Sequence, residues 1–298
     1  FKQKTAYEIR LSLVGSEMCI RDRLSSLLTD HCSTKALFSS CITGQLMVLS
    51  IPIAAIPPAI VRCALRGHGE NYTPLAGCSD ESARLIAFHQ VSYQGWRAEV
   101  AAAYQQAVTY AGSTGAPIFL VAFSLGALLG CDLLATAADV RFARMILLAP
   151  ALALHAYCHL PALLAHWPQL SIRSRAPSFY RANRVTPIAA YHALYTALRH
   201  LHHQPGAALN IPTLVLIDPA DELVSAQGIE RFVLNKRLTQ WQLHPIHKAP
   251  AQTGHTVRHL ILDPASVGAA VWQHMLEQIT MHLCHKQIAV ATDDSINV

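Results

Sequence analysis

The stretch IFLVAFSLGALLG, from Ile118 to Gly130, passes from an apolar run through a serine into a helical pattern with almost no loop between them. A serine in so abrupt a turn has a strained backbone, and small residues are needed two positions before and after it. Ala122 and Gly126 meet that need around Ser124. The pattern therefore predicts a nucleophile elbow, which holds a serine hydroxyl above the edge of a sheet. The alternative is a serine that only caps the following helix.

Short apolar runs alternate with helical patterns on both sides of this stretch, which indicates a doubly wound, mostly parallel α/β sheet. The strands are expected at Pro117–Phe123, Ala143–Ala149, Pro212–Asp218 and, more weakly, Thr239–Ile246. The helices are expected at Trp96–Ala111, Leu125–Ala138 and Pro264–Leu283. The segment Leu152–Leu209 has no strand-like run, so it predicts inserted helices.

The composition allows a sizeable core and argues against a dedicated nucleic-acid binder. The chain has 298 residues, of which 52% are hydrophobic and only 14% charged, with a formal net charge of +5. Its Lys and Arg residues are scattered rather than gathered into a basic stripe. The first residues, Phe1–Arg23, back-translate into strings that look like sequencing-library adapters. We therefore exclude them and expect one α/β domain over residues 24–298.

The apolar run Leu46–Val61 is sixteen residues long and contains three prolines. A membrane-spanning helix needs about 20 residues, so a buried strand with turns is favoured over a span or a signal remnant. The remaining cysteines are odd in number and dispersed, which favours a reducing, cytoplasmic location.

An activated serine needs a base and an orienting acid, which follow it in the order acid and then histidine in elbow folds. The strand at Pro212–Asp218 runs into DPADELV, residues 218–224. Asp221 is favoured as the acid because it lies beyond the strand end, where the loop can turn back towards the serine. Asp218 is expected to bond the loop backbone as a turn residue, and Glu222 is a third option.

The base must come later in the chain, and GHTVRHLILD, residues 254–263, contains both His255 and His259. Their positions alone do not separate them. The pattern His200-x-His202-His203 has no acidic or cysteine partner nearby in the sequence, so no metal site is expected. No cofactor is expected either.

Together these segments resemble the α/β-hydrolase superfamily, within its esterase/lipase branch of monoacylglycerol-lipase-like and serine-aminopeptidase-like proteins, over about residues 62–283. RGHGE, residues 66–70, looks like the family's G-H-G turn after a core strand. Trp96 stands where the branch often has a tryptophan that opens a helix. The resemblance also selects Asp221, which precedes a valine by three residues. It selects His259, which an aliphatic pair and an acid follow.

The resemblance implies a catalytic triad in which Ser124 is the nucleophile, His259 the base and Asp221 the orienting acid, with the Leu125 N–H in the oxyanion hole. It also implies that the segment Leu152–Leu209 covers the site. Its aromatic, Leu and Ala residues would line or brace an apolar cavity that suits a lipophilic ester. We therefore expect a carboxylic-ester hydrolase with a small-molecule substrate.

One departure from the family pattern concerns the second oxyanion donor. That donor usually follows a His-Gly pair, which does not occur between Leu24 and Val61. The residues Ser26–Asp30 stand about where it belongs. Two alternatives follow: a thioesterase or small-peptide hydrolase with the same triad, and a non-catalytic ligand-binding protein that lacks a complete oxyanion hole.

Overall fold

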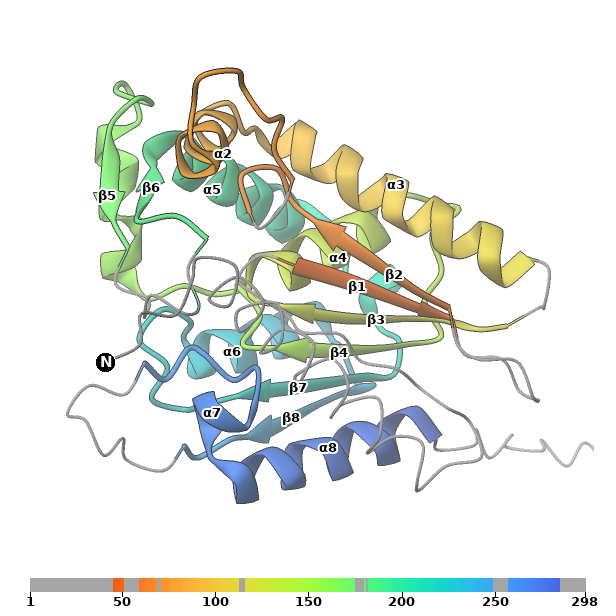
Figure 1. Cartoon of the computed structure of the whole chain (residues 1–298). Helices are drawn as coiled ribbons and strands as arrows, with labels where there is room; N and C mark the ends of the chain where they lie inside the picture. The colour runs from red at the N-terminus through yellow and green to blue at the C-terminus, as the bar shows by residue number, and fades with distance from the viewer. Residues whose placement is uncertain are drawn as a thin grey trace, which may run out of the picture.

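The computed structural model describes residues 45–50, 59–68, 71–112, 116–174, 180, 182–248 and 257–284. In this part of the chain a central six-stranded sheet has the order β2-β1-β3-β4-β7-β8 (Figure 1). Its strands are β1 (Gln45–Ser50), β2 (Ala59–Ala64), β3 (Ile118–Phe123), β4 (Arg144–Leu148), β7 (Thr213–Ile217) and β8 (Trp241–Pro245). The last four are parallel to one another. The predicted α/β class with a mostly parallel sheet is confirmed.

The central strands bury side chains on both faces of the sheet. On β3, Leu120 and Ala122 belong to one hydrophobic cluster, whereas Phe119, Val121 and Phe123 belong to another. Because successive side chains of a strand point to opposite faces, one continuous apolar run fills both cores. This explains why the apolar run before Ser124 shows no polar alternation.

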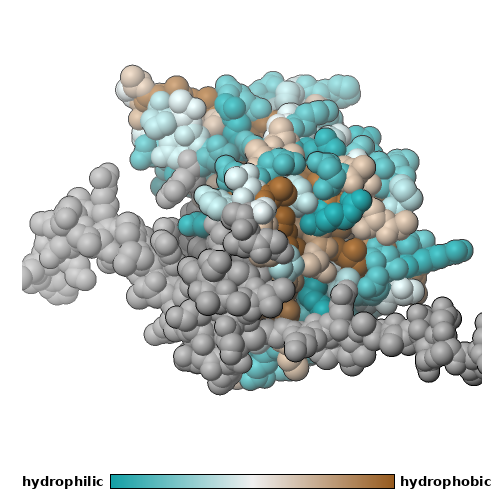
Figure 2. Space-filling model, turned by 90° about the vertical axis from the view of Figure 1, so that its right-hand side faces the viewer, coloured by the Kyte–Doolittle hydropathy of each residue, from teal (hydrophilic) through white to brown (hydrophobic). Residues whose placement is uncertain are grey.

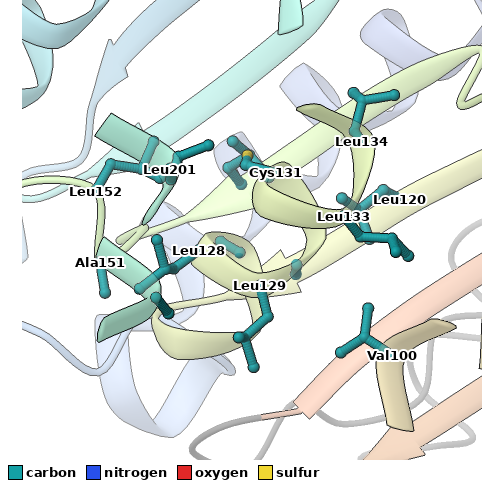
Figure 3. Packing of buried hydrophobic residues seen from close by; sticks show 14 of the residues in the cluster. Val100, Leu120, Leu128, Leu129, Cys131, Leu133, Leu134, Ala151, Leu152 and Leu201 are labelled. Atoms are coloured by element: carbon teal, nitrogen blue, oxygen red, sulfur yellow. The ribbon is translucent and has the colours of Figure 1, made fainter. Parts of the chain in front are cut away.

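Helices cover the two faces. The first cluster takes side chains from α2 (Asp80–His89), α3 (Tyr93–Gly112), α4 (Leu125–Thr136), α5 (Ile188–His203) and α6 (Ala226–Lys236). The second takes side chains from α8 (Ala269–Cys284), which lies on the opposite side of the sheet (Figure 1). The helix α4 is buried on most sides, and its leucines pack against α3, β3 and α5 (Figure 3). A helix that is apolar all round is expected only inside a core.

Two terminal segments differ from the sequence expectation. The run Leu46–Val61 contributes to two antiparallel strands, with Val48 opposite Val61, rather than to one. The strand β1 is also antiparallel to β3, so its start lies at the edge of the sheet where β3 ends. The single helix expected over Pro264–Leu283 is divided into α7 (Pro264–Val267) and α8, because Gly268 between them has a φ of 93°.

The insertion is not made of helices alone, so that prediction was wrong in part. It contains η1 (Ala156–Leu164), α5 and η3 (Ala207–Leu209), together with an antiparallel pair of short strands, β5 (Ser171–Arg173) and β6 (Val185–Pro187). A strand of three residues is too short for an alternating pattern to be visible in the sequence. Pairing across the intervening chain, with Ile172 opposite Thr186, is a tertiary property.

Exposed apolar side chains gather in this insertion. Tyr157, Leu160, Leu163, Trp167 and Leu170 are all exposed. On the side of the molecule seen in Figure 2, hydrophobic and hydrophilic residues are instead interspersed. Among the helices that the structure describes, none is long and apolar enough to cross a membrane.

Candidate active site

Ser124 stands in the turn between β3 and α4 with a φ of 49° and a ψ of −114°. Few non-glycine residues adopt a positive φ, and such strain persists only where the surroundings impose it. Here the Ser124 N–H donates to the Leu148 carbonyl at 2.9 Å, and the Ser124 carbonyl accepts from the Ala151 N–H at 3.1 Å. The hydroxyl makes no capping bond to α4. It is therefore not the ordinary helix cap that the sequence left as an alternative.

The loop after β7 presents two buried aspartates with different partners. Asp221 Oδ2 lies 2.8 Å from His259 Nδ1, and its Oδ1 accepts the N–H groups of Leu223 and Val224 at 2.7 and 2.9 Å. Asp218 instead accepts the Ala220 N–H at 2.8 Å through Oδ1. The structure thus places Asp221 beside the histidine and Asp218 in the turn.

His259 joins the two other predicted residues. Its side chain is 7% exposed, and its Nε2 lies 2.9 Å from the Ser124 Oγ. The Phe123 ring packs beside the imidazole, with 5.0 Å between the ring centroids. A neutral imidazole that donates Nδ1–H to Asp221 leaves Nε2 free to accept the serine proton, which is the tautomer that a general base needs. His255 lies outside the described residues.

The N-terminus of α4 points its free N–H groups at this site. The first turn of an α-helix leaves its N–H groups without intrahelical acceptors, and the Leu125 N–H is the first of them. Intrahelical bonding begins with the Leu128 N–H, which donates to the Ser124 carbonyl at 3.2 Å. Such a group is suited to a developing oxyanion. The residues Ser26–Asp30, where a second donor was sought, lie outside the described part of the chain.

The loop after β2 emerges at the same edge of the sheet, because β2 and β3 are both antiparallel to β1. The Trp96 indole donates to the Arg66 carbonyl at 3.1 Å, and the His68 ring lies against Trp96 and Phe88. Trp96 lies in the first turn of α3, which begins at Tyr93. It therefore braces this loop rather than starting the helix.

Side-chain hydrogen bonds join the insertion to the loops around the site. The His155 ring bonds the Asp221 carbonyl at 2.9 Å, the Tyr180 hydroxyl donates to Asp263 at 2.9 Å, and the Asn183 amide donates to the Gly67 carbonyl at 2.7 Å. The Tyr157 hydroxyl also donates to the Glu222 carbonyl. The insertion is thus attached to the loop after β7 that carries Asp221, here called the acid loop. It is also attached to the helix after His259 and to the loop after β2.

Sequence reasoning missed the contacts that two charged side chains make in this region. Glu222, weighed only as a triad acid, accepts the N–H groups of Arg258 and His259. The Lys248 ammonium is buried among carbonyl groups. Burial lowers the pKa of Lys248, although the Glu222 and Asp218 carboxylates oppose part of that shift. No sequence pattern marks a buried lysine, whereas the position of Glu222 beside Asp221 was a visible signal.

Within the described residues, no group of three or more His, Cys, Asp or Glu side chains could hold a metal ion. His200, which the sequence placed in a histidine-rich run, bonds the buried Asp132 through Nδ1 at 2.6 Å. His202 bonds the Leu152 carbonyl at 2.8 Å. His200 thus joins α5 to α4, and His202 joins α5 to the loop after β4.

Comparison with known proteins identifies one family model, described as serine aminopeptidase, S33, which matches residues 59–250. The match covers Ser124 and Asp221 and ends before His259. A search of curated protein sequences finds no significant match.

Solved structures that share the fold include the following two. One comes from a study of LipS and LipT, two metagenome-derived lipolytic enzymes; it is 17% identical, covers 74% of this chain and 80% of its own, and has a TM-score of 0.54. The other is a soluble variant of monoglyceride lipase from Saccharomyces cerevisiae in complex with a substrate analog. It is 11% identical, covers 76% of this chain and 78% of its own, and has a TM-score of 0.55.

Proposed function

The chain belongs to the serine aminopeptidase (S33) family of α/β hydrolases, and we propose that it is a serine hydrolase that cleaves carboxylic esters of lipophilic or small uncharged substrates. The observation that carries this proposal is a continuous hydrogen-bonded chain. It runs from Ser124 Oγ to His259 Nε2 at 2.9 Å and from His259 Nδ1 to Asp221 Oδ2 at 2.8 Å. These three residues would form the catalytic triad.

In the proposed reaction, Ser124 Oγ attacks the ester carbonyl while His259 Nε2 takes the hydroxyl proton. The oxyanion that forms is stabilised by the Leu125 N–H at the start of α4. As the ester C–O bond breaks, His259 returns the proton to the leaving alcohol. Water then attacks the acyl-enzyme and gives a proton to His259, which returns it to Ser124 Oγ as the acid is released. Asp221 holds the imidazole in the required tautomer throughout.

The insertion, which we propose forms a cap over about residues 152–209, supports an uncharged substrate. The chain contains no Asp or Glu between Asp139 and Asp218. An aminopeptidase must bind the ammonium group of a peptide N-terminus, and a charge removed from water needs a partner of opposite sign. The exposed apolar side chains Tyr157, Leu160 and Leu163, close in sequence to the contacts with the acid loop, suit an apolar group instead.

The family description favours peptide hydrolysis as a second candidate function, because the same triad cleaves amides. Acidic groups outside the insertion, such as Glu222, would then have to bind the ammonium. The Glu222 carboxylate already accepts two backbone N–H groups, which argues against that role.

The first test is labelling of the folded chain with a fluorophosphonate probe, followed by peptide mass spectrometry. We expect an adduct on Ser124 and none on Ser124→Ala. His259→Ala should slow labelling by about 1000-fold or more, whereas His255→Ala should leave it unchanged. Turnover of p-nitrophenyl esters and of aminoacyl p-nitroanilides would then separate the ester and peptide proposals. Labelling at another serine, or undiminished labelling of Ser124→Ala, would overturn the triad.

A further inference from the structure

His259 lies in the segment 257–260, to which the structure assigns neither helix nor strand. Its imidazole must nevertheless stay within hydrogen-bond distance of both Ser124 and Asp221. An irregular backbone has no ladder of its own to hold it, so other groups must satisfy its N–H and C=O groups. A general base tolerates errors of only about 0.5 Å in its position.

The N–H side of this segment is bound by one carboxylate oxygen. Glu222 Oε2 accepts the Arg258 N–H at 2.9 Å and the His259 N–H at 3.1 Å. Glu222 follows Asp221 directly in the chain. The two adjacent carboxylates therefore hold the same residue, Asp221 by its ring and Glu222 by its backbone.

The C=O side is bound by one ammonium. Lys248 Nζ donates to the Val257 and Leu260 carbonyls, both at 2.5 Å, and the lysine is 6% exposed. Asp218 joins this lysine to the loop, because its Oδ2 lies 3.4 Å from the Lys248 backbone N and 3.0 Å from Arg258 Nη1. Charge-assisted hydrogen bonds of this kind are stronger than neutral ones. The backbone around His259 is thus held between a negative and a positive side chain.

We propose that Glu222 and Lys248 are positioning residues that fix the backbone of His259 so that its ring reaches both Ser124 and Asp221. The proposal rests on the triad proposed above. Neither side chain needs to touch the substrate, so their effect on the reaction passes through His259. The negative Glu222 faces the partly positive N–H groups, and the positive Lys248 faces the partly negative C=O groups, so each side chain complements the backbone charge.

The test is a double-mutant cycle on ester turnover, measured as kcat and KM for p-nitrophenyl butyrate. Glu222→Ala should lower kcat by about 10- to 100-fold, because small displacements of a catalytic group have effects of that size, with KM within about twofold. Glu222→Gln should stay within about fivefold of the unaltered chain, because one amide oxygen can accept both N–H groups in place of Oε2. The exposed Glu230→Ala on α6 serves as the matched control and should change neither constant.

The decisive comparison uses a chain from which the proposed base, His259, has been removed. In a His259→Ala background, adding Glu222→Ala should alter the residual activity by less than about twofold, because its target is absent. An equal loss in both backgrounds, or an unchanged kcat for Glu222→Ala, would overturn the proposal. Lys248→Met should also lower kcat with an unchanged KM. If Lys248→Met does not fold, the proposal is decided by Glu222→Gln, whose kcat should stay within about fivefold of that of the unaltered chain. A chain whose Ser124 does not react with the fluorophosphonate would instead disprove the triad.

Discussion

Backbone strain is concentrated beside the proposed nucleophile. Among the described residues other than glycine, Ser124, Ala149 and Arg237 have positive φ angles. Ser124 follows β3 and Ala149 follows the adjacent β4, and the Ala149 N–H donates to the Leu216 carbonyl at 2.8 Å. Each such residue costs about 1–3 kcal/mol, which the paired strands on either side must offset. Strain at this edge is thus maintained by the sheet that carries it.

A glycine on a neighbouring loop is required for two separate reasons. Gly67 has a φ of 80°, and a Cβ atom at this position would lie 2.5 Å from the Phe88 side chain and 2.6 Å from the Phe88 backbone. We predict that Gly67→Ala lowers the free energy of unfolding by about 2–4 kcal/mol, as measured by urea denaturation. Gly77 is the matched control, because it has a φ of 77° with nothing within 4 Å of such a Cβ. Gly77→Ala should lose only about 1 kcal/mol, and equal losses would contradict the steric argument.

A buried carboxylate joins three helices behind the proposed nucleophile. Asp132 on α4 is fully buried; it accepts the Tyr93 hydroxyl of α3 at 2.7 Å and lies 2.6 Å from His200 Nδ1 of α5. Arg97 Nε is 3.8 Å away. A charge in this position is tolerated only because it is paired and hydrogen-bonded. The helix α4 is therefore attached by a polar contact both to α3 and to the insertion.

Removing this carboxylate should loosen the packing of the three helices. We predict that Asp132→Ala lowers the free energy of unfolding by about 2 kcal/mol, because it removes the bonds of Tyr93 and His200 to the buried carboxylate and the ion pair with Arg97. Tyr93→Phe leaves the contacts of Asp132 with His200 and Arg97 in place and should lose about 1 kcal/mol. Both losses are to be measured by chemical denaturation. An Asp132→Ala chain as stable as Tyr93→Phe would show that His200 and Arg97 contribute nothing to the contact.

The stability of the chain should fall on mild acidification, and His68 supplies one identifiable cause. Its ring packs against Phe88 and Trp96, its Nδ1 is buried without a hydrogen-bond partner among the described residues, and burial lowers its pKa to about 4. An unfolded histidine takes up its proton near pH 6.5. Below that pH the unfolded state binds more protons than the folded state, so the free energy of unfolding decreases as the pH falls from about 6.5 to 4.

This contribution should amount to at most about 3 kcal/mol at pH 4. It is measured as the difference in unfolding free energy between pH 7 and pH 4.5 for the unaltered chain and for His68→Gln. The variant should lose less stability over that range, because glutamine does not titrate. The same pH dependence in both chains would contradict the assignment to His68.

Local patterns in the sequence were sufficient for the strands β3, β4 and β7 and for the turn at Ser124. A run of apolar residues specifies a strand buried on both faces, and the small residues around the serine permit the turn. All of that information lies within about ten residues, where sequence spacing translates directly into geometry. The choice of Asp221 and His259 drew in addition on the family resemblance.

Contacts between distant segments were decided by packing. Ser124 and His259 are 135 residues apart, and the Glu222 and Lys248 bonds to the His259 segment join parts of the chain that have no shared sequence pattern. The short strands β5 and β6 and the antiparallel direction of β1 arise in the same way. Hydrogen bonds between remote segments form only after the sheet and helices bring them together, so their partners cannot be found from the spacing of residues along the chain.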